Sequence, residues 1–154
     1  MLRPILLVED NPNDLELTLF ALEKIKLANE VIVTRDGEEA LDYLLAKGRY
    51  AGRPEGNPAL VLLDLKLPKI DGVEVLHRMR NMPSLATVPV VMFTSSSEEK
   101  DVAATYAAGI NSYVVKPIDF NAFVSAVSQL GVYWSIINEP PLDVVKAIAS
   151  ETFD

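Results

Sequence analysis

The sequence predicts an α/β protein in which helices cover both faces of a parallel sheet. Short apolar runs alternate with segments of helical periodicity about five times along the chain. Four of these runs stop directly at a polar residue, and each is short enough to be a buried strand. Strand–helix alternation with short links is typical of right-handed crossovers between parallel strands.

The first two strand–helix units begin the chain. Residues 5–8 form the first apolar run, and Asn11-Pro12 then supplies an N-cap followed by proline at the first helical position. Residues 31–33 indicate a second strand, and Gly37 opens a short helix. The apolar positions of the two helices repeat at helical spacing: Leu15, Leu19, Leu22 and Ile25, then Ala40, Leu41, Leu44 and Leu45.

The third unit follows a long connection. Residues 48–58 are rich in Gly, Pro and Arg, which predicts a surface loop longer than most connections in compact domains. The third strand, 60–63, leads through a turn at 68–72 into another helix. The apolar face of that helix carries Val75, Leu76 and Met79. A fourth strand is expected at 90–93.

The last two helices flank a fifth strand at 113–115. Before that strand, the polar stretch 95–99 is expected to cap a helix that ends near Gly109. After it, Asp119 can cap a long final helix. The inner face of the final helix carries Phe123, Val127 and Leu130.

Composition limits the possible functions. At 154 residues the chain is most simply one domain, large enough to bury its own core. A formal charge of −8 argues against nucleic acid as a direct partner, because that affinity rests on Lys and Arg. The absence of cysteine excludes disulfides and Cys-ligated metal, and it suits the cytoplasm. We expect no signal peptide, no membrane-spanning segment and no basic patch for a membrane surface.

The chain divides unevenly at its C-terminal end. We expect residues 1–135 to form the domain and residues 136–154 to form an extension, with no output domain. The segment Glu139-Pro140-Pro141 is the candidate boundary. Beyond it, the apolar residues have the spacing of one short amphipathic helix: Leu142, Val145, Ile148 and Ala149. The extension is either packed on the domain or frayed.

Polar residues follow four of the predicted strands. They are Glu9, Asp10, Asp64, Thr94 and Lys116. The carboxyl ends of parallel strands meet at one edge of the sheet, where open α/β sheets bind their ligands. Three carboxylates, a hydroxyl and an ammonium at that edge suit a hard cation and a phosphate. Each residue alone would be an ordinary cap or turn residue, but together they predict a phosphoryl-transfer site.

Phosphoryl transfer depends mainly on positioning and on neutralisation of charge. A carboxylate attacks phosphorus poorly unless the repulsion is screened, and Mg²⁺ screens it through oxygen ligands. Asp64 as the acceptor, with Asp10 and Glu9 as metal ligands, meets this need. Lys116 can pair with a phosphoryl oxygen. Thr94 can donate a hydrogen bond to another.

Motifs at these strand ends resemble those of the receiver domain of two-component response regulators. The motifs are Val8-Glu9-Asp10-Asn11, Leu63-Asp64-Leu65-Lys66-Leu67-Pro68 with Asp71-Gly72, Phe93-Thr94-Ser95, and Tyr113-Val114-Val115-Lys116-Pro117. They follow one another in the order and at the spacing of the family. The resemblance covers about residues 4–130.

The resemblance implies a fold and a phosphorylation site. The fold would be a flavodoxin-like (βα)5 three-layer sandwich with a parallel sheet in the order 2-1-3-4-5. Asp64 would be the phosphoacceptor. A Mg²⁺ ion would be held by Glu9, Asp10, Asp64 and the backbone carbonyl of Lys66.

The resemblance also implies a conformational switch. Thr94 would be the switch hydroxyl and Tyr113 the rotating aromatic. Lys116 would contact the phosphate and precede a cis bond to Pro117, which is conceivable because X–Pro bonds adopt cis at little cost. The protein would then be no enzyme in the usual sense, but a phosphoacceptor that assists its own phosphorylation and dephosphorylation.

Further segments are similar to the stand-alone response regulators of bacterial and cyanobacterial phytochromes. These segments are residues 36–44, the long loop before the third strand, and Tyr133-Trp134 with residues 138–141. The resemblance implies a sensor histidine kinase, of phytochrome type, as phosphodonor. With no output domain, we predict a homodimer through a surface that carries Val102, Tyr106, Tyr113 and Phe120.

Other functions fit the residues less well. A flavin-binding electron carrier needs a hydroxyl- and Gly-rich loop after the first strand, where this chain has Glu9-Asp10-Asn11-Pro12. An aspartyl-phosphate phosphatase has its acceptor after the first strand, whereas Asp64 follows the third. A degenerate receiver that acts as a static adaptor would lack the acidic cluster and Lys116. Within the family, the alternative is an intermediate receiver in a phosphorelay.

Overall fold

A computed structural model describes residues 2–141 of the chain. In this part of the chain, five parallel strands form one sheet in the order β2-β1-β3-β4-β5. The strands are β1 (Ile5–Val8), β2 (Val31–Thr34), β3 (Leu60–Leu63), β4 (Val90–Thr94) and β5 (Ser112–Val115). The sheet order implied by the resemblance is therefore confirmed.

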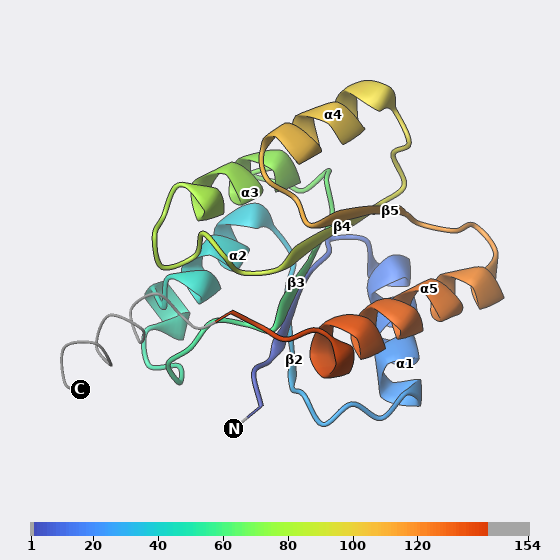
Figure 1. Ribbon diagram of the computed structural model, residues 1–154, viewed down its shortest axis with the longest axis horizontal. Helices are drawn as coiled ribbons and strands as arrows, with labels where there is room; N and C mark the ends of the chain where they lie inside the picture. The colour runs from blue at the N-terminus through green and yellow to red at the C-terminus, as the bar shows by residue number, and fades with distance from the viewer. Residues whose placement is uncertain (1, 142–154) are drawn as a thin grey trace.

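Helices cover both faces of the sheet. They are α1 (Pro12–Lys24), α2 (Gly37–Leu44), α3 (Gly72–Arg80), α4 (Glu99–Ala107) and α5 (Phe120–Val132). Figure 1 shows α1 and α5 on one face, with α2 and α3 on the other. The 3-10 turn η1 (Gly48–Tyr50) follows α2, and the π-helical turn η2 (Tyr133–Ile137) continues α5. This arrangement is the three-layer sandwich that was predicted.

Successive side chains of each strand enter two separate hydrophobic cores. In β1, Leu6 and Val8 join the core under α2 and α3, whereas Ile5 and Leu7 join the core under α1 and α5. The strands β1 and β3 have a neighbour on both sides, and every residue in them is buried. Burial on both faces explains why their sequences are continuous apolar runs without polar alternation.

Polar caps begin four of the helices close to the carboxyl edge of the sheet. In each case a side-chain oxygen accepts backbone N–H groups of the first helical turn, which otherwise lack partners. The pairs are Asn11 with Asn13 and Asp14, Asp36 with Glu39, Asp71 with Glu74, and Asp119 with Ala122. The caps predicted at Asn11 and Asp119 are therefore confirmed.

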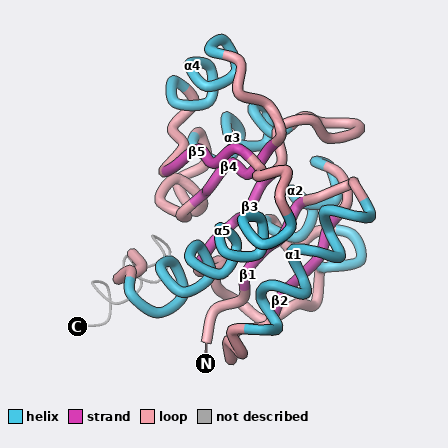
Figure 2. Tube along the Cα trace, turned by 90° about the vertical axis from the view of Figure 1, so that its right-hand side faces the viewer, coloured by secondary structure: helices cyan, strands magenta, loops and turns pink. Residues whose placement is uncertain are grey.

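Helix α4 is anchored less firmly than the other helices. Its N-cap residue, Glu98, makes no side-chain capping bond. Within the preceding polar stretch, the Ser96 hydroxyl instead donates to Asp101 at 2.5 Å. Thr105 is the one buried residue of the helix. Figure 2 shows α4 at one end of the molecule, and with one buried residue the helix has little core packing.

Residues Phe120–Ile137 are long and apolar enough to cross a membrane by length and composition alone, contrary to the sequence-based expectation. In the fold this stretch is α5 with η2. Its Phe123, Val124 and Val127 are buried in the core shared with α1, which lies beside α5 in Figures 1 and 2. The core helix of a globular domain passes the same test.

The described chain ends close to its beginning. Helix α5 runs directly into η2, so the boundary predicted near residue 135 falls within one continuous helical stretch. Arg3 Nη1 then donates a hydrogen bond to the carbonyl oxygen of Pro141 at 3.1 Å. The amphipathic helix predicted at 142–149 lies outside the described residues.

Gly72 allows the first turn of α3 to approach the loop that carries Asp64. Its N–H donates to the Leu65 carbonyl at 2.7 Å, and a Cβ here would lie 2.2 Å from the Asp64 carbonyl oxygen. We expect Gly72→Ala to lower the free energy of unfolding by about 1–3 kcal/mol, the usual range for overpacking. Urea unfolding measures this change.

Gly52→Ala is the matched control, because nothing lies within 4 Å of a Cβ at Gly52. We expect this variant to unfold at the urea concentration of the wild type or slightly above it. Equal destabilisation of the two variants would show that the close approach at Gly72 does not limit stability.

Candidate functional site

The sheet register brings the residues predicted from the sequence to one edge. Val8 pairs with Leu63, and Thr94 pairs with Val115. The residues that follow these strands therefore come level with one another. Those at the edge are Glu9, Asp64, Thr94 and Lys116, all buried, and Asp10, which is exposed.

Lys116 is the centre of the cluster. Its Nζ donates to Glu9 Oε1 at 2.5 Å, to Asp14 Oδ2 at 2.8 Å and to Asp64 Oδ2 at 2.9 Å. Only 5% of its side chain is exposed. An ammonium has three N–H donors and no acceptor, so these three carboxylates use its whole hydrogen-bonding capacity.

The backbone fixes where the ammonium can reach. The Lys116 N–H donates to the Thr94 carbonyl at 2.7 Å, which continues the ladder between β4 and β5. The bond from Lys116 to Pro117 is trans, and no cis bond occurs within residues 2–141. The predicted cis bond is therefore wrong for this structure, which has the form that X–Pro bonds ordinarily favour by roughly 0.5–1 kcal/mol.

Burial and charge act in opposite directions on the pKa values of the cluster. Burial raises the pKa of Glu9 to about 7, with the hydrogen bond to Asp64 adding to the rise and Lys116 opposing it. Burial would lower the pKa of Lys116, but its hydrogen bonds to Asp14 and Glu9 and the charge of Asp64 outweigh this and raise it. Lys116 therefore stays charged and compensates the buried carboxylates.

Three carboxylates of the cluster could hold a metal ion. Ligand oxygens of Glu9, Asp10 and Asp64 all lie within 4.8 Å of one another. Two of these groups already have fixed orientations, because Asp64 Oδ1 accepts the Leu65 N–H at 2.7 Å and Glu9 Oε2 accepts the Asn11 N–H at 3.2 Å. Three hard oxygen donors fit Mg²⁺, which prefers carboxylate and water ligands.

A cavity of about 360 Å³ opens beside the Asp64 carboxylate. It is lined by Asp64, Lys66, Thr94 and residues 95–98. Two hydrogen bonds hold one wall: Ser96 N–H donates to Thr94 Oγ1 at 3.4 Å, and Tyr113 Oη donates to the Ser96 carbonyl at 2.8 Å. Thr94 and Tyr113, the two predicted switch residues, therefore both hold the loop before α4.

Asp14 is the site residue that sequence reasoning missed. It lies in the first turn of α1, three residues after the N-cap Asn11. An acidic residue in a first helical turn is ordinarily explained by the helix macrodipole, so nothing in the sequence singled it out. The usable signal was its position, because α1 starts at the same edge of the sheet as Lys116.

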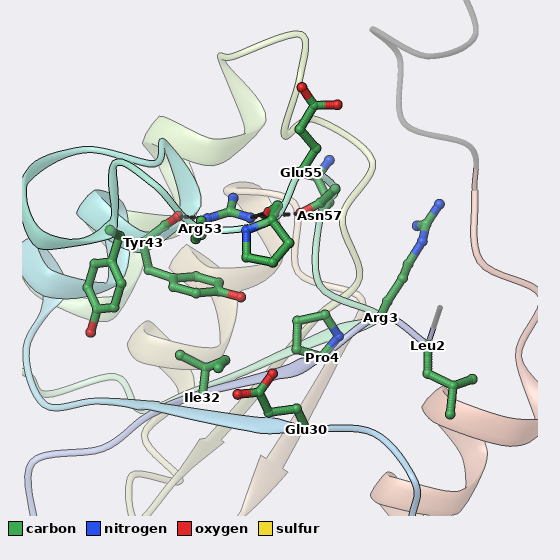
Figure 3. Close-up of a pocket in the computed structure, with 12 residues that line it drawn as sticks. Leu2, Arg3, Pro4, Glu30, Ile32, Tyr43, Arg53, Glu55 and Asn57 are labelled. Carbon is green, nitrogen blue, oxygen red and sulfur yellow. Dashed lines mark hydrogen bonds between the residues drawn. The ribbon is translucent and has the colours of Figure 1, made fainter.

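A larger cavity, of about 420 Å³, lies near the opposite edge of the sheet (Figure 3). Its lining includes Pro4 and Ile32 from the starts of β1 and β2. Arg53 holds its loop wall in place, with its guanidinium carbon 4.5 Å from the centre of the Tyr43 ring. The same guanidinium donates to the carbonyls of Tyr43, Leu44, Pro54 and Gly56. None of the acidic cluster lines this cavity, so it is separate from the site.

The fold and the cluster agree with a known family. The family model of the response regulator receiver domain matches residues 5–128. This match covers the whole sheet and every residue of the site. The chain therefore belongs to the response regulator receiver domains.

Individual response regulators are also similar to this chain, and Rcp1 is one of them. Response regulator Rcp1 of Synechocystis sp. is 38% identical over 130 residues, which cover 84% of this chain and 87% of Rcp1. The structure of the Mn(2+)-bound form of Rcp1 gives a TM-score of 0.84 at 36% identity, covering 91% of this chain and 99% of that chain.

Two solved phytochrome response regulators are also similar. The bacteriophytochrome response regulator AtBRR is 61% identical, with a TM-score of 0.73. The match covers 90% of this chain and 99% of the AtBRR chain. The structure of the phosphorylated cyanobacterial phytochrome response regulator RcpA is 36% identical, with a TM-score of 0.86. The match covers 92% of this chain and 100% of the RcpA chain. The predicted resemblance to phytochrome response regulators is confirmed.

Proposed function

We propose that this receiver domain accepts a phosphoryl group on Asp64 from the phosphohistidine of a sensor histidine kinase, with Mg²⁺ as cofactor. One observation carries the proposal: the buried ammonium of Lys116 contacts Glu9 and Asp64, two of the three carboxylates that could hold a cation. The names of two relatives support it, since RcpA is described as phosphorylated and Rcp1 as Mn(2+)-bound.

Asp64 is the nucleophile in this proposal. A bond forms between a carboxylate oxygen of Asp64 and phosphorus, while the P–N bond of the phosphohistidine breaks and its electron pair stays on the imidazole nitrogen. Lys116 donates a hydrogen bond to a phosphoryl oxygen. Mg²⁺ held by Glu9, Asp10, Asp64 and the Lys66 carbonyl would neutralise the charge between carboxylate and phosphate.

Thr94 and Tyr113 would transmit the change. Thr94 is buried beside Asp64, and its hydroxyl can turn toward a phosphoryl oxygen. The Ser96 N–H would then lose its acceptor, which loosens the loop that Tyr113 holds through its hydroxyl. Movement of Tyr113 into the space left by Thr94 would shift α4, whose packing on the core is the weakest.

The output in this proposal is a changed protein-binding surface and not turnover of a substrate. The net charge of −8 leaves nucleic acid and anionic membrane surfaces as poor partners. The similarity to AtBRR and RcpA supports a phytochrome-type kinase as the donor. We place the protein in the cytoplasm, where such a kinase presents its phosphohistidine.

Phosphorylation of Asp64 is the direct test. We expect acetyl phosphate with Mg²⁺ to add the mass of one phosphoryl group, measured on the intact protein. Asp64→Asn should abolish the gain, and so should chelation of the cation. Uptake that survives either treatment would place the acceptor elsewhere or exclude a role for the cation.

An exposed apolar patch lies beside the site and suits the docking of the kinase. Ile118 is fully exposed two residues after Lys116, and the rings of Phe20 and Phe120 are half-exposed with centroids 6.1 Å apart. These side chains join the start of α5 to α1. A partner that delivers phosphate to Asp64 must cover this edge of the sheet, and it would bury this apolar surface.

The variant Ile118→Asp tests docking of the kinase separately from phosphorylation of Asp64. With a histidine kinase that phosphorylates the wild type, we expect transfer to slow at least tenfold, because a charge then opposes an apolar contact. Uptake from acetyl phosphate should stay unchanged. Leu2→Asp is the control, since Leu2 is also exposed but lies at the other edge. Equal transfer to both variants would exclude the patch as the docking surface.

An adjoining apolar surface, which shares Phe120 with this patch, supports the predicted homodimer. Tyr106 of α4, Val115 of β5 and Phe120 of α5 are exposed. Val102 and Tyr113 lie on the same elements and are partly buried. This surface includes α4, which the switch would move. Phosphorylation could therefore change its fit to a second copy of the chain.

Sedimentation velocity with and without beryllium fluoride tests the dimer. We expect the phosphoryl mimic to strengthen association by about 1–3 kcal/mol, the usual size of such couplings. Tyr106→Glu should weaken it by placing a charge in the interface. A monomer in both states at micromolar concentration would contradict the dimer. A dimer indifferent to Tyr106→Glu would place the interface elsewhere.

A further inference from the structure

Asp14 has a contact that neither the family motifs nor the proposed reaction uses. Its carboxylate accepts a hydrogen bond from Lys116 Nζ at 2.8 Å, and its side chain is 25% exposed. The contact joins α1 to the residue after β5, across 102 positions of sequence. It is therefore a tertiary contact and not a product of local helix chemistry.

The other two partners of Lys116 would have different roles in the phosphorylated, cation-bound site. Glu9 belongs to the group of carboxylates that could hold a cation, and Asp64 would carry the phosphoryl group. Once Asp64 carries a phosphoryl group, its own two oxygens no longer share a carboxylate charge and accept hydrogen bonds more weakly, and a cation held by Glu9 would compete with Lys116 for that carboxylate. Asp14 is outside the cation group, so it keeps Lys116 as its partner.

The backbone holds Asp14 firmly in place. Its N–H donates to Asn11 Oδ1 at 3.0 Å, and its carbonyl accepts the Thr18 hydroxyl at 2.7 Å. Both contacts lie in the first turns of α1, whose inner face is packed in the core. The short Asp side chain therefore presents its carboxylate from a nearly fixed point.

We propose that Asp14 is a positioning residue that orients the Lys116 ammonium toward the phosphoryl group on Asp64. It does so by accepting a hydrogen bond from one of the three N–H groups of Lys116 while Glu9 binds the cation and Asp64 carries the phosphoryl group. Without this hydrogen bond, the ammonium can turn toward any neighbouring carboxylate. It then points toward the phosphoryl oxygens, where negative charge develops, in a smaller fraction of the molecules. The inference rests on the proposed phosphorylation of Asp64.

The test uses phosphorylation of the full chain by acetyl phosphate with Mg²⁺, followed as a rate against donor concentration. We expect Asp14→Asn to lower the rate at saturating donor about 10-fold to 100-fold, as is usual when a partner that orients a functional group is lost. The donor concentration for half-saturation should stay the same or fall, because a negative charge is removed. Asp14→Glu should recover most of the rate.

Glu16→Gln is the matched control, since it removes the same charge from an exposed position on α1. We expect this variant to behave as the wild type. In a Lys116→Ala background, Asp14→Asn should have no further effect, because Asp14 acts only through Lys116. Thermal unfolding of each variant verifies that rate differences are measured on folded protein.

The outcomes separate this inference from the proposed function. If the wild type takes up no phosphoryl group, the proposed function fails. If the wild type is active but Asp14→Asn matches Glu16→Gln, the positioning role of Asp14 is overturned. A faster rate in Asp14→Asn, or a full effect of that change in the Lys116→Ala background, overturns it as well.

Discussion

The site depends on one buried positive charge. Lys116 is almost fully enclosed, and its ammonium donates to three carboxylates that come from different parts of the chain. Neither sign of charge would be stable there alone, because removing one partner of a buried ion pair typically costs about 3–5 kcal/mol. The cluster therefore links α1, β1, β3 and β5 at the edge of the sheet where Asp64 lies. Any ligand that changes the partners of Lys116 must also change the forces among these elements.

The topology makes this arrangement possible. Parallel strands in the order 2-1-3-4-5 bring the ends of β1, β3, β4 and β5 to one edge, and capped helices leave from the same edge. Asp64 follows β3, which lies between β1 and β4, and it shares a cavity with the loop that leads into the loosely packed α4. In the function proposed above, a change at Asp64 would act first on this loop and on α4.

Much of the fold and part of the site could be predicted from the sequence. Apolar runs such as 60–63 predict buried strands because both faces of the sheet are covered, and residues such as Asp119 predict helix starts because they cap N–H groups. The side chains at strand ends could be placed at one edge by topology alone. The start of α1 places Asp14 at that edge as well, but its contact with Lys116 could not be predicted, because it depends on how the helix packs relative to β5. The trans form of the bond from Lys116 to Pro117 was not predicted either, because no local sequence pattern decides between cis and trans.

Phosphorylation of Asp64 is tested most directly by locating the phosphoryl group itself. The protein is treated with acetyl phosphate and Mg²⁺, reduced with borohydride, which converts an aspartyl phosphate to homoserine, and mapped by peptide mass spectrometry. We expect homoserine at position 64 alone, and none when the cation is chelated. Homoserine at another acidic residue, or none at all in protein that has gained the phosphoryl mass, would contradict it.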